Sequence, residues 1–244
     1  MRHTWTVLGR ELRSYFSTPI AYIFLVIYLV ATQGFFFYLF FRVGEADLRL
    51  FFFWQPLFML FLIPAITMRS WAEEKKVGTM EMLMTLPVPD LQVVLGKFFA
   101  CLIFWTIALV LTVTMPWTVY RLVDVSQGAT VDPGPIIGGY VGLFLLGGVY
   151  IAICLFASSL TENQIVAFII GLASCTVLLL IGSTLVLYTV PESLVKPLQF
   201  IGLWANFENI SRGVIDSRNV IYYLSVTALF LYLNASMIES RKWK

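Results

Sequence analysis

Residues 69–97, RSWAEEKKVGTMEMLMTLPVPDLQVVLGK, form a charged interval between two long apolar runs. The four consecutive charges at 73–76 cannot lie in hydrocarbon, so the chain must leave the membrane here. Apolar residues then recur at helical spacing, at Val77, Met80, Leu83 and Met84. The pattern predicts a short amphipathic helix that ends at Pro87-Val88-Pro89, with Asp90 capping the next helix. An ordinary charged loop between two spans is the alternative.

The composition extends the membrane assignment to the whole chain. Hydrophobic residues make up 59% of the 244 residues and charged residues 12%, whereas about 25% charged residues is usual in a soluble domain. The apolar runs have the length of membrane-crossing helices. We therefore expect an all-α integral membrane protein, with residues 1–244 forming a single transmembrane domain. The expected spans are 20–41, 51–68, 98–119, 136–160, 165–188 and 220–237.

The sequence contains no recognisable catalytic, metal-binding or nucleotide-binding motif. All three cysteines lie inside apolar runs, and His3 is the only histidine, so a metal site or a histidine-based catalytic site has no ligands or base. The Gly96-Lys97 pair lacks the rest of a phosphate-binding loop. With a net charge of only +2, nucleic acid is not an expected partner. We predict no catalytic, cofactor-binding or metal-binding residues in this chain, which is not an enzyme.

The first 18 residues are amphipathic. One stripe holds Trp5, Leu8, Leu12, Tyr15 and Phe16, and the opposite side holds Arg10, Glu11, Arg13 and Ser14. This pattern predicts an interfacial helix in residues 1–18 that lies flat on the membrane lipid and ends at Pro19. A simple juxtamembrane extension is the alternative. Lys97, near the start of the third span, is expected to snorkel to the interface.

Small residues mark helix-packing faces. Gly138 and Gly142 form a G-x-x-x-G pair, and Gly148 and Gly171 extend the small faces of spans four and five. Residues 190–219 are too polar to span but contain several aromatic residues, so we expect short external or re-entrant helices before span six. A soluble external loop is the alternative.

The orientation follows from the Lys and Arg residues. Six spans place both termini and the 69–97 interval on one side, which then holds ten of the sixteen basic residues. These are Arg2, Arg10, Arg13, Arg69, Lys75, Lys76, Lys97, Arg241, Lys242 and Lys244. The positive-inside rule puts this side in the cytoplasm.

The ordered string from Glu73 to Lys97 resembles the loop of type-2 ABC permeases, most closely the gliding-motility-like permease subfamily. The shared features are an acidic pair, Gly78-Thr79, a Glu-Met-Leu run, Thr-Leu-Pro-Val and a Gly-Lys pair. The resemblance returns at 206–208, 212–216 and 222–223. It implies a cytoplasmic coupling helix between spans two and three that contacts a separate ATPase. The implied contact residues are Glu73, Glu74, Val77, Gly78, Thr79, Met80, Glu81, Leu83 and Met84.

The resemblance also implies which subunits accompany this chain and in which membrane it lies. ATP and Mg would be bound by an ABC ATPase subunit, beside a second permease copy or paralogue in the bacterial cytoplasmic (inner) membrane. A periplasmic accessory subunit would be compatible with this arrangement.

Three functions remain open at this stage. No ionisable residue lies in the middle of a span, so energy must enter elsewhere, and we expect the permease subunit of an ATP-driven transporter with an unidentified substrate. One alternative is a membrane anchor that transmits force from an ATPase to a periplasmic partner without solute transport. Another is an ATP-independent channel.

Overall fold

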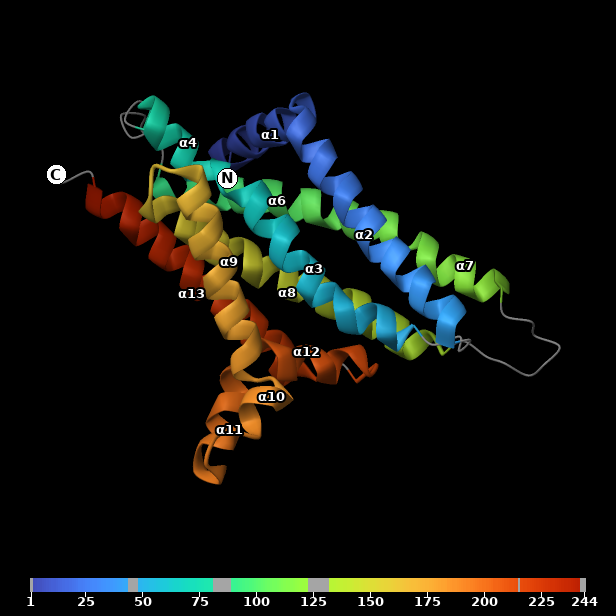
Figure 1. The fold of residues 1–244 in the computed structure, drawn as a ribbon. Helices are drawn as coiled ribbons and strands as arrows, with labels where there is room; N and C mark the ends of the chain where they lie inside the picture. Colours follow the sequence, from blue (N-terminus) through green and yellow to red (C-terminus); the bar gives the residue numbers. More distant parts are fainter. Residues whose placement is uncertain (1, 44–47, 81–88, 123–131, 215, 242–244) are drawn as a thin grey trace.

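The computed structural model describes residues 2–43, 48–80, 89–122, 132–214 and 216–241, and all regular structure in these ranges is helical. The helices are α1 (Arg2–Ser17), α2 (Pro19–Val43), α3 (Arg49–Thr67), α4 (Arg69–Val77), α6 (Asp90–Thr112), α7 (Thr114–Leu122), α8 (Pro133–Leu160), α9 (Gln164–Ile181), α10 (Thr184–Leu187), α11 (Glu192–Ile201), α12 (Leu203–Ser211) and α13 (Ser217–Arg241). The first, α1, lies across the end of the bundle where both chain termini and α4 are found (Figure 1).

The described residues contain six helices long and apolar enough to cross a membrane, which confirms the expected all-α architecture. The largest differences from the expected limits of the spans are at three ends. The second runs through α3 and α4 to Val77, and the third begins at Asp90. The fifth ends at Ile181, because the chain turns where Gly182 meets Gly202. A Cβ on Gly182 would lie 2.6 Å from the Cα of Gly202.

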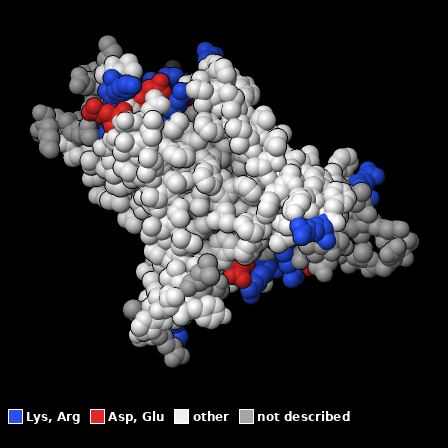
Figure 2. All heavy atoms as spheres, viewed as in Figure 1, with Lys and Arg blue, Asp and Glu red and all other residues white. Residues whose placement is uncertain are grey.

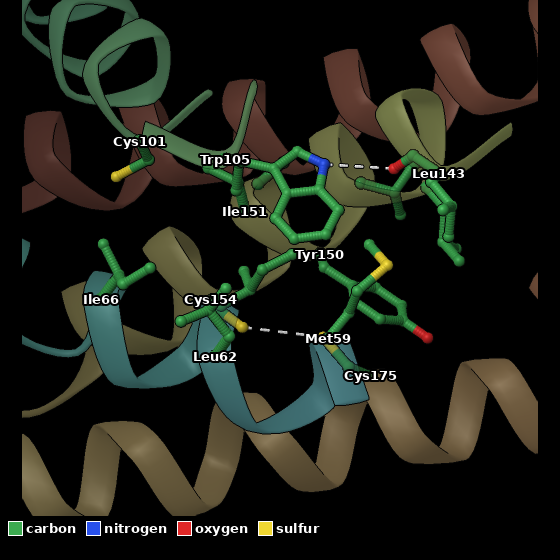
Figure 3. Close-up of a cluster of buried hydrophobic side chains, with 14 of the residues drawn as sticks. Met59, Leu62, Ile66, Cys101, Trp105, Leu143, Tyr150, Ile151, Cys154 and Cys175 are labelled. Atoms are coloured by element: carbon green, nitrogen blue, oxygen red, sulfur yellow. Dashed lines mark hydrogen bonds between the residues drawn. The ribbon is translucent and has the colours of Figure 1, made fainter. Parts of the chain in front are cut away.

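The fourth span, α8, is the centre of the bundle. It packs against α3, α6, α9, α12 and α13, and its middle is almost fully buried. Trp105 of α6 donates from Nε1 to the carbonyl oxygen of Leu143, 3.2 Å away, in the space left by Gly147 (Figure 3). The thiols of Cys154 and Cys175 lie 3.6 Å apart within the same core. In contrast, only 17%, 22% and 22% of the membrane-crossing windows of α2, α9 and α13 is buried, and each of these helices exposes several large apolar side chains, as helices that face lipid do.

The glycines predicted to pack helices fall into two groups. A side chain at Gly138 would overlap the carbonyl oxygen of Ile210, one at Gly142 would lie 3.1 Å from Phe207, and one at Gly171 would lie 3.1 Å from Cys154 Sγ. These glycines let α8 approach α12 and α9. Gly148 is different, because the nearest atom to its added Cβ is 3.9 Å away. The structure therefore does not require a glycine there.

Three short helices, α10, α11 and α12, separate α9 from α13 at the end opposite to α4 (Figure 1). They occupy the region where short external or re-entrant helices were expected. Of these, α12 is held against α8, and Tyr223 of α13 donates to the carbonyl oxygen of Leu203 at 2.9 Å.

Candidate functional site at the junction of α1, α4 and α6

The second span continues beyond the bundle as α4, and Ser158 of α8 fixes the joint. The first N–H groups of a helix have no partner within that helix. Here Ser158 Oγ accepts from the N–H groups of Trp71 and Ala72, both at 3.2 Å, and donates to the carbonyl oxygen of Met68 at 2.9 Å. The Lys75 ammonium donates to the carbonyl oxygen of Ser159. The start of α4 is therefore tied to the end of α8.

On its other side α4 meets α1, which lies along α6. Gly96 permits this contact, because a Cβ at this position would lie only 2.8 Å from Val7 Cβ. Tyr15 of α1 places its hydroxyl 3.1 Å from Cys101 Sγ and 3.4 Å from Ser70 Oγ. Three elements distant in the sequence thus share one buried contact.

At the centre of this contact lies Lys97, whose side chain is 1% exposed. Its ammonium donates to Glu11 Oε1 at 3.0 Å and to Glu74 Oε1 at 2.9 Å. It also donates to the carbonyl oxygen of Ser70 at 2.8 Å and lies 4.7 Å from the centre of the Trp71 ring. A buried ammonium has three donors to satisfy, and here all three are used.

Arg10 completes the cluster by donating to both Glu11 and Glu74 at 2.9 Å. The two basic and two acidic groups balance in charge, which is the condition for burying them. We call Arg10, Glu11, Glu74 and Lys97 the junction cluster. Figure 2 shows acidic and basic atoms mixed at the upper end of the molecule, with further charged groups at the lower and right-hand edges and a largely uncharged surface between them.

The protonation of Glu11 reflects these contacts. Burial alone would raise the pKa of Glu11, but the charge of Lys97 and the hydrogen bonds from Arg10 and Lys97 outweigh it. The pKa of Glu11 is therefore lowered from its ordinary value of 4.5. Burial by itself would lower the pKa of Arg10, and the carboxylates of Glu11 and Glu74 raise it instead. Both residues are charged at neutral pH.

Two sequence-based expectations are wrong here. Lys97 does not snorkel, because α1 covers it and supplies a carboxylate. Glu11 was placed on the polar side of α1, yet it faces inward, while Trp5 is 70% exposed and Phe16 is also exposed. Leu8, Leu12 and Tyr15 remain partly buried. The signal that was missed is Lys97, a lysine within an apolar helix that needs an acidic partner.

The sequence profile described as "ABC-2 family transporter protein" matches residues 51–243, which is more than half of the chain. This chain belongs to the ABC-2 transporter family. It is a multi-pass membrane permease component of an ABC transporter. The resemblance to type-2 ABC permeases is confirmed at the level of the family. No curated protein matches the chain.

In this ABC-2 permease the expected coupling segment differs from the single amphipathic helix that was predicted to end at Pro87-Val88-Pro89. Its first part, α4, ends at Val77, because Gly78 adopts the left-handed conformation with φ 76°. Thr79 and Met80 begin another helical turn, in which Met80 is buried and Thr79 is exposed. Glu81, Leu83 and Met84 lie outside the described residues.

The acidic pair of the same segment divides between two environments. Glu74 is turned into the junction cluster and its side chain is only 17% exposed, whereas Glu73 is about half exposed. Val77, at the tip of α4, is 68% exposed. The surface that this ABC-2 permease offers at the tip of α4 therefore includes Glu73, Val77 and Thr79.

Proposed function

We propose that this chain is the permease subunit of an ATP-driven ABC transporter and that α4, with the segment after it, is the coupling element. A separate ATPase subunit binds ATP and Mg and hydrolyses the nucleotide. The permease provides the path for an unidentified substrate. The match over residues 51–243 to the ABC-2 transporter family is the observation that carries this proposal.

The way α4 is held supports its role as a mechanical link. It continues the second span, is bonded to α8 through Ser158, and is bonded to α1 and α6 through Glu74. A displacement applied at its tip would therefore reach several spans together instead of being lost in a loop. The exposed Val77 lies at that tip, where a partner can bury it.

The proposed setting is the bacterial cytoplasmic membrane, with both termini in the cytoplasm and a second permease copy or paralogue completing the path. The charge asymmetry of the chain supports this orientation. Within the family, the residues around Gly78 and Asn206 favour the gliding-motility-like permeases. The match to a transporter family gives no support to a force-transmitting anchor without transport.

Orientation is tested by thiol labelling in intact cells. Single cysteines at Lys76 and Ser240 are expected to resist an impermeant reagent, and one at Asn209 is expected to react. The reverse pattern would place α4 outside the cell and exclude an ATPase contact.

Coupling is tested by substituting Val77 with Asp in the tagged chain, purified from native membranes together with its ATPase. We expect at least a tenfold loss of co-purifying ATPase activity, because a charge replaces an apolar anchor at an interface. Val214→Asp is the matched control, since Val214 is also 68% exposed but lies beside α12 at the opposite end. Equal ATPase recovery with both variants, each inserted at wild-type level, would contradict a coupling role for the α4 tip.

A further inference from the structure

A cavity of about 370 Å³ lies beside the junction cluster, under the corner between α1 and α2. Its walls come from α1, α2, the end of α3, the start of α4, and Lys97 of α6. One end is polar and reaches the surface at Arg10 and Glu73, which are about half exposed. The other end is apolar and is formed by Ile20, Phe24 and Ile66.

Some polar atoms of the residues that line this cavity have hydrogen-bond partners, and others do not. The members of the junction cluster bond to one another, as described above. Arg69 is different, because its closest acidic atom is Glu73 Oε2 at 3.9 Å from Nε, which is too long for a hydrogen bond. Within the described part of the chain, Arg69 Nε is buried without a hydrogen-bond partner, and so is the second carboxylate oxygen of Glu74. Arg69 and Glu74 therefore line the same cavity, and each has a polar atom without a hydrogen-bond partner.

The charges that line the cavity balance, with three basic and three acidic side chains. They are Arg10, Arg69, Lys97, Glu11, Glu73 and Glu74. A simple anion near Arg69 would be repelled by Glu73, and a simple cation near Glu73 would be repelled by Arg69. A group that carries one charge of each sign satisfies both. A phosphodiester suits the fork of a guanidinium, and an ammonium with N–H donors suits a carboxylate.

The position of the cavity indicates where such a group comes from. It lies where the amphipathic α1 turns into α2, and the start of a membrane-crossing helix that follows an amphipathic helix is expected near the membrane surface. Its apolar end continues onto α2, which exposes Ile23 and Ile27 to the surroundings. A volume of about 370 Å³ is near the lower limit for small-ligand pockets, which is room for a lipid headgroup but not for its acyl chains.

We propose that this cavity binds the headgroup of a phospholipid that carries a phosphodiester and a primary ammonium, as ethanolamine phospholipids do. The phosphate pairs with Arg69, and the ammonium donates to Glu73, with the free oxygen of Glu74 within the same polar end. The bound lipid would lie against both α1 and α4, so the headgroup would brace the junction. This inference does not depend on the proposed ATPase contact.

The test uses the full-length chain, delipidated in detergent and titrated by native mass spectrometry. The probes are dioleoyl phosphatidylethanolamine, phosphatidylcholine and phosphatidylglycerol. We expect at least tenfold tighter binding of the ethanolamine lipid than of the other two. Arg69→Gln should weaken its binding at least tenfold. Glu73→Gln should reduce the preference for ethanolamine over choline, because a neutral amide no longer favours an ammonium.

Arg13→Gln is the matched control, since Arg13 lies on α1 at the same membrane surface but does not line the cavity. It should leave the lipid preference unchanged. Ala21→Leu fills the cavity wall without altering any charge and should displace the ethanolamine lipid, which provides a second probe if Arg69→Gln does not fold.

Several results would overturn the proposal. One is equal binding of the three lipids, and another is tighter binding of phosphatidylglycerol, which would show selection for net negative charge. Unchanged ethanolamine-lipid binding in Arg69→Gln or in a folded Ala21→Leu would also overturn it. So would release of the ATPase by Arg69→Gln with lipid binding intact, since this would assign the polar end to a protein contact. Loss of lipid preference with ATPase binding retained would support the proposal.

Discussion

Replacing Lys97 with Met tests whether the junction cluster holds α1 in place. Methionine replaces the apolar stem of the lysine as far as Cε and lacks the ammonium. Glu11 and Glu74 then face each other with Arg10 as their remaining shared partner, and the carbonyl oxygen of Ser70 loses its donor. The cluster changes from balanced to net negative.

The structure sets the size of the effect. Removing one member of a buried ion pair costs about 3–5 kcal/mol, because the other member is left charged and desolvated. Glu11 and Glu74 are 13% and 17% exposed and retain Arg10, so the lower end applies. We expect α1 to be destabilised on α6 by about 3 kcal/mol, which is about a 100-fold increase in the population of its detached state.

The assay follows the reactivity of a thiol introduced at Val7, which faces Gly96 in the α1–α6 contact. Its labelling rate should rise about 100-fold in Lys97→Met. Lys76→Met is the matched control, because Lys76 lies in α4 with an exposed side chain, and its labelling rate should equal that of the parent. Adding Glu11→Gln to Lys97→Met restores the charge balance and should recover part of the protection.

Two outcomes would refute this reasoning. Labelling of Val7→Cys at the parental rate in Lys97→Met would show that apolar packing alone holds α1. Equal labelling of Lys97→Met with and without Glu11→Gln would show that the charge imbalance is not the cause of detachment.

The remaining predictions concern acid, the α4 joint and α8. Because the pKa of Glu11 is lowered on folding, its stabilisation is present above about pH 4.5 and is lost as the pH falls through the folded-state value. Labelling of the Val7 thiol should rise in acid, and Glu11→Gln should show a smaller rise. Ser158→Ala removes three hydrogen bonds to backbone groups of Met68, Trp71 and Ala72 and should lower thermal stability by about 1–3 kcal/mol, whereas Ser159→Ala, whose hydroxyl bonds only within its own helix, should not; equal melting temperatures would contradict this. Gly138→Ala should reduce the yield of folded protein, and Gly148→Ala should not, since only Gly138 touches a neighbouring backbone; the opposite order would place α12 elsewhere.

The sequence by itself determined the class of the protein. Runs of about 20 apolar residues cannot be buried in a soluble domain of this length, so the spans follow from composition and hydropathy alone. The charges at 73–76 had to leave the membrane for the same reason. The order of residues around Gly78-Thr79 indicated the type-2 permeases, and the family match confirmed this assignment.

Part of the candidate site was visible in the same way. The tip of α4 was expected to be polar and helical, and Glu73 and Val77 are exposed there. The helix break at Gly78 was not predicted, because apolar spacing continues across it, while a single left-handed glycine ends the helix.

Only the tertiary structure decided which charges are paired. Glu11, Glu74 and Lys97 lie far apart in the chain, and no local pattern states that α1 will cover α6. That arrangement depends on Gly96, which allows the close approach, and on Ser158, which directs α4 toward α1. Periodicity describes one helix at a time, so it places Glu11 on the polar side of α1. Burial of Lys97 of α6 is stabilised by carboxylates from α1 and α4. The pairing with Glu11 turns the polar side of α1 inward.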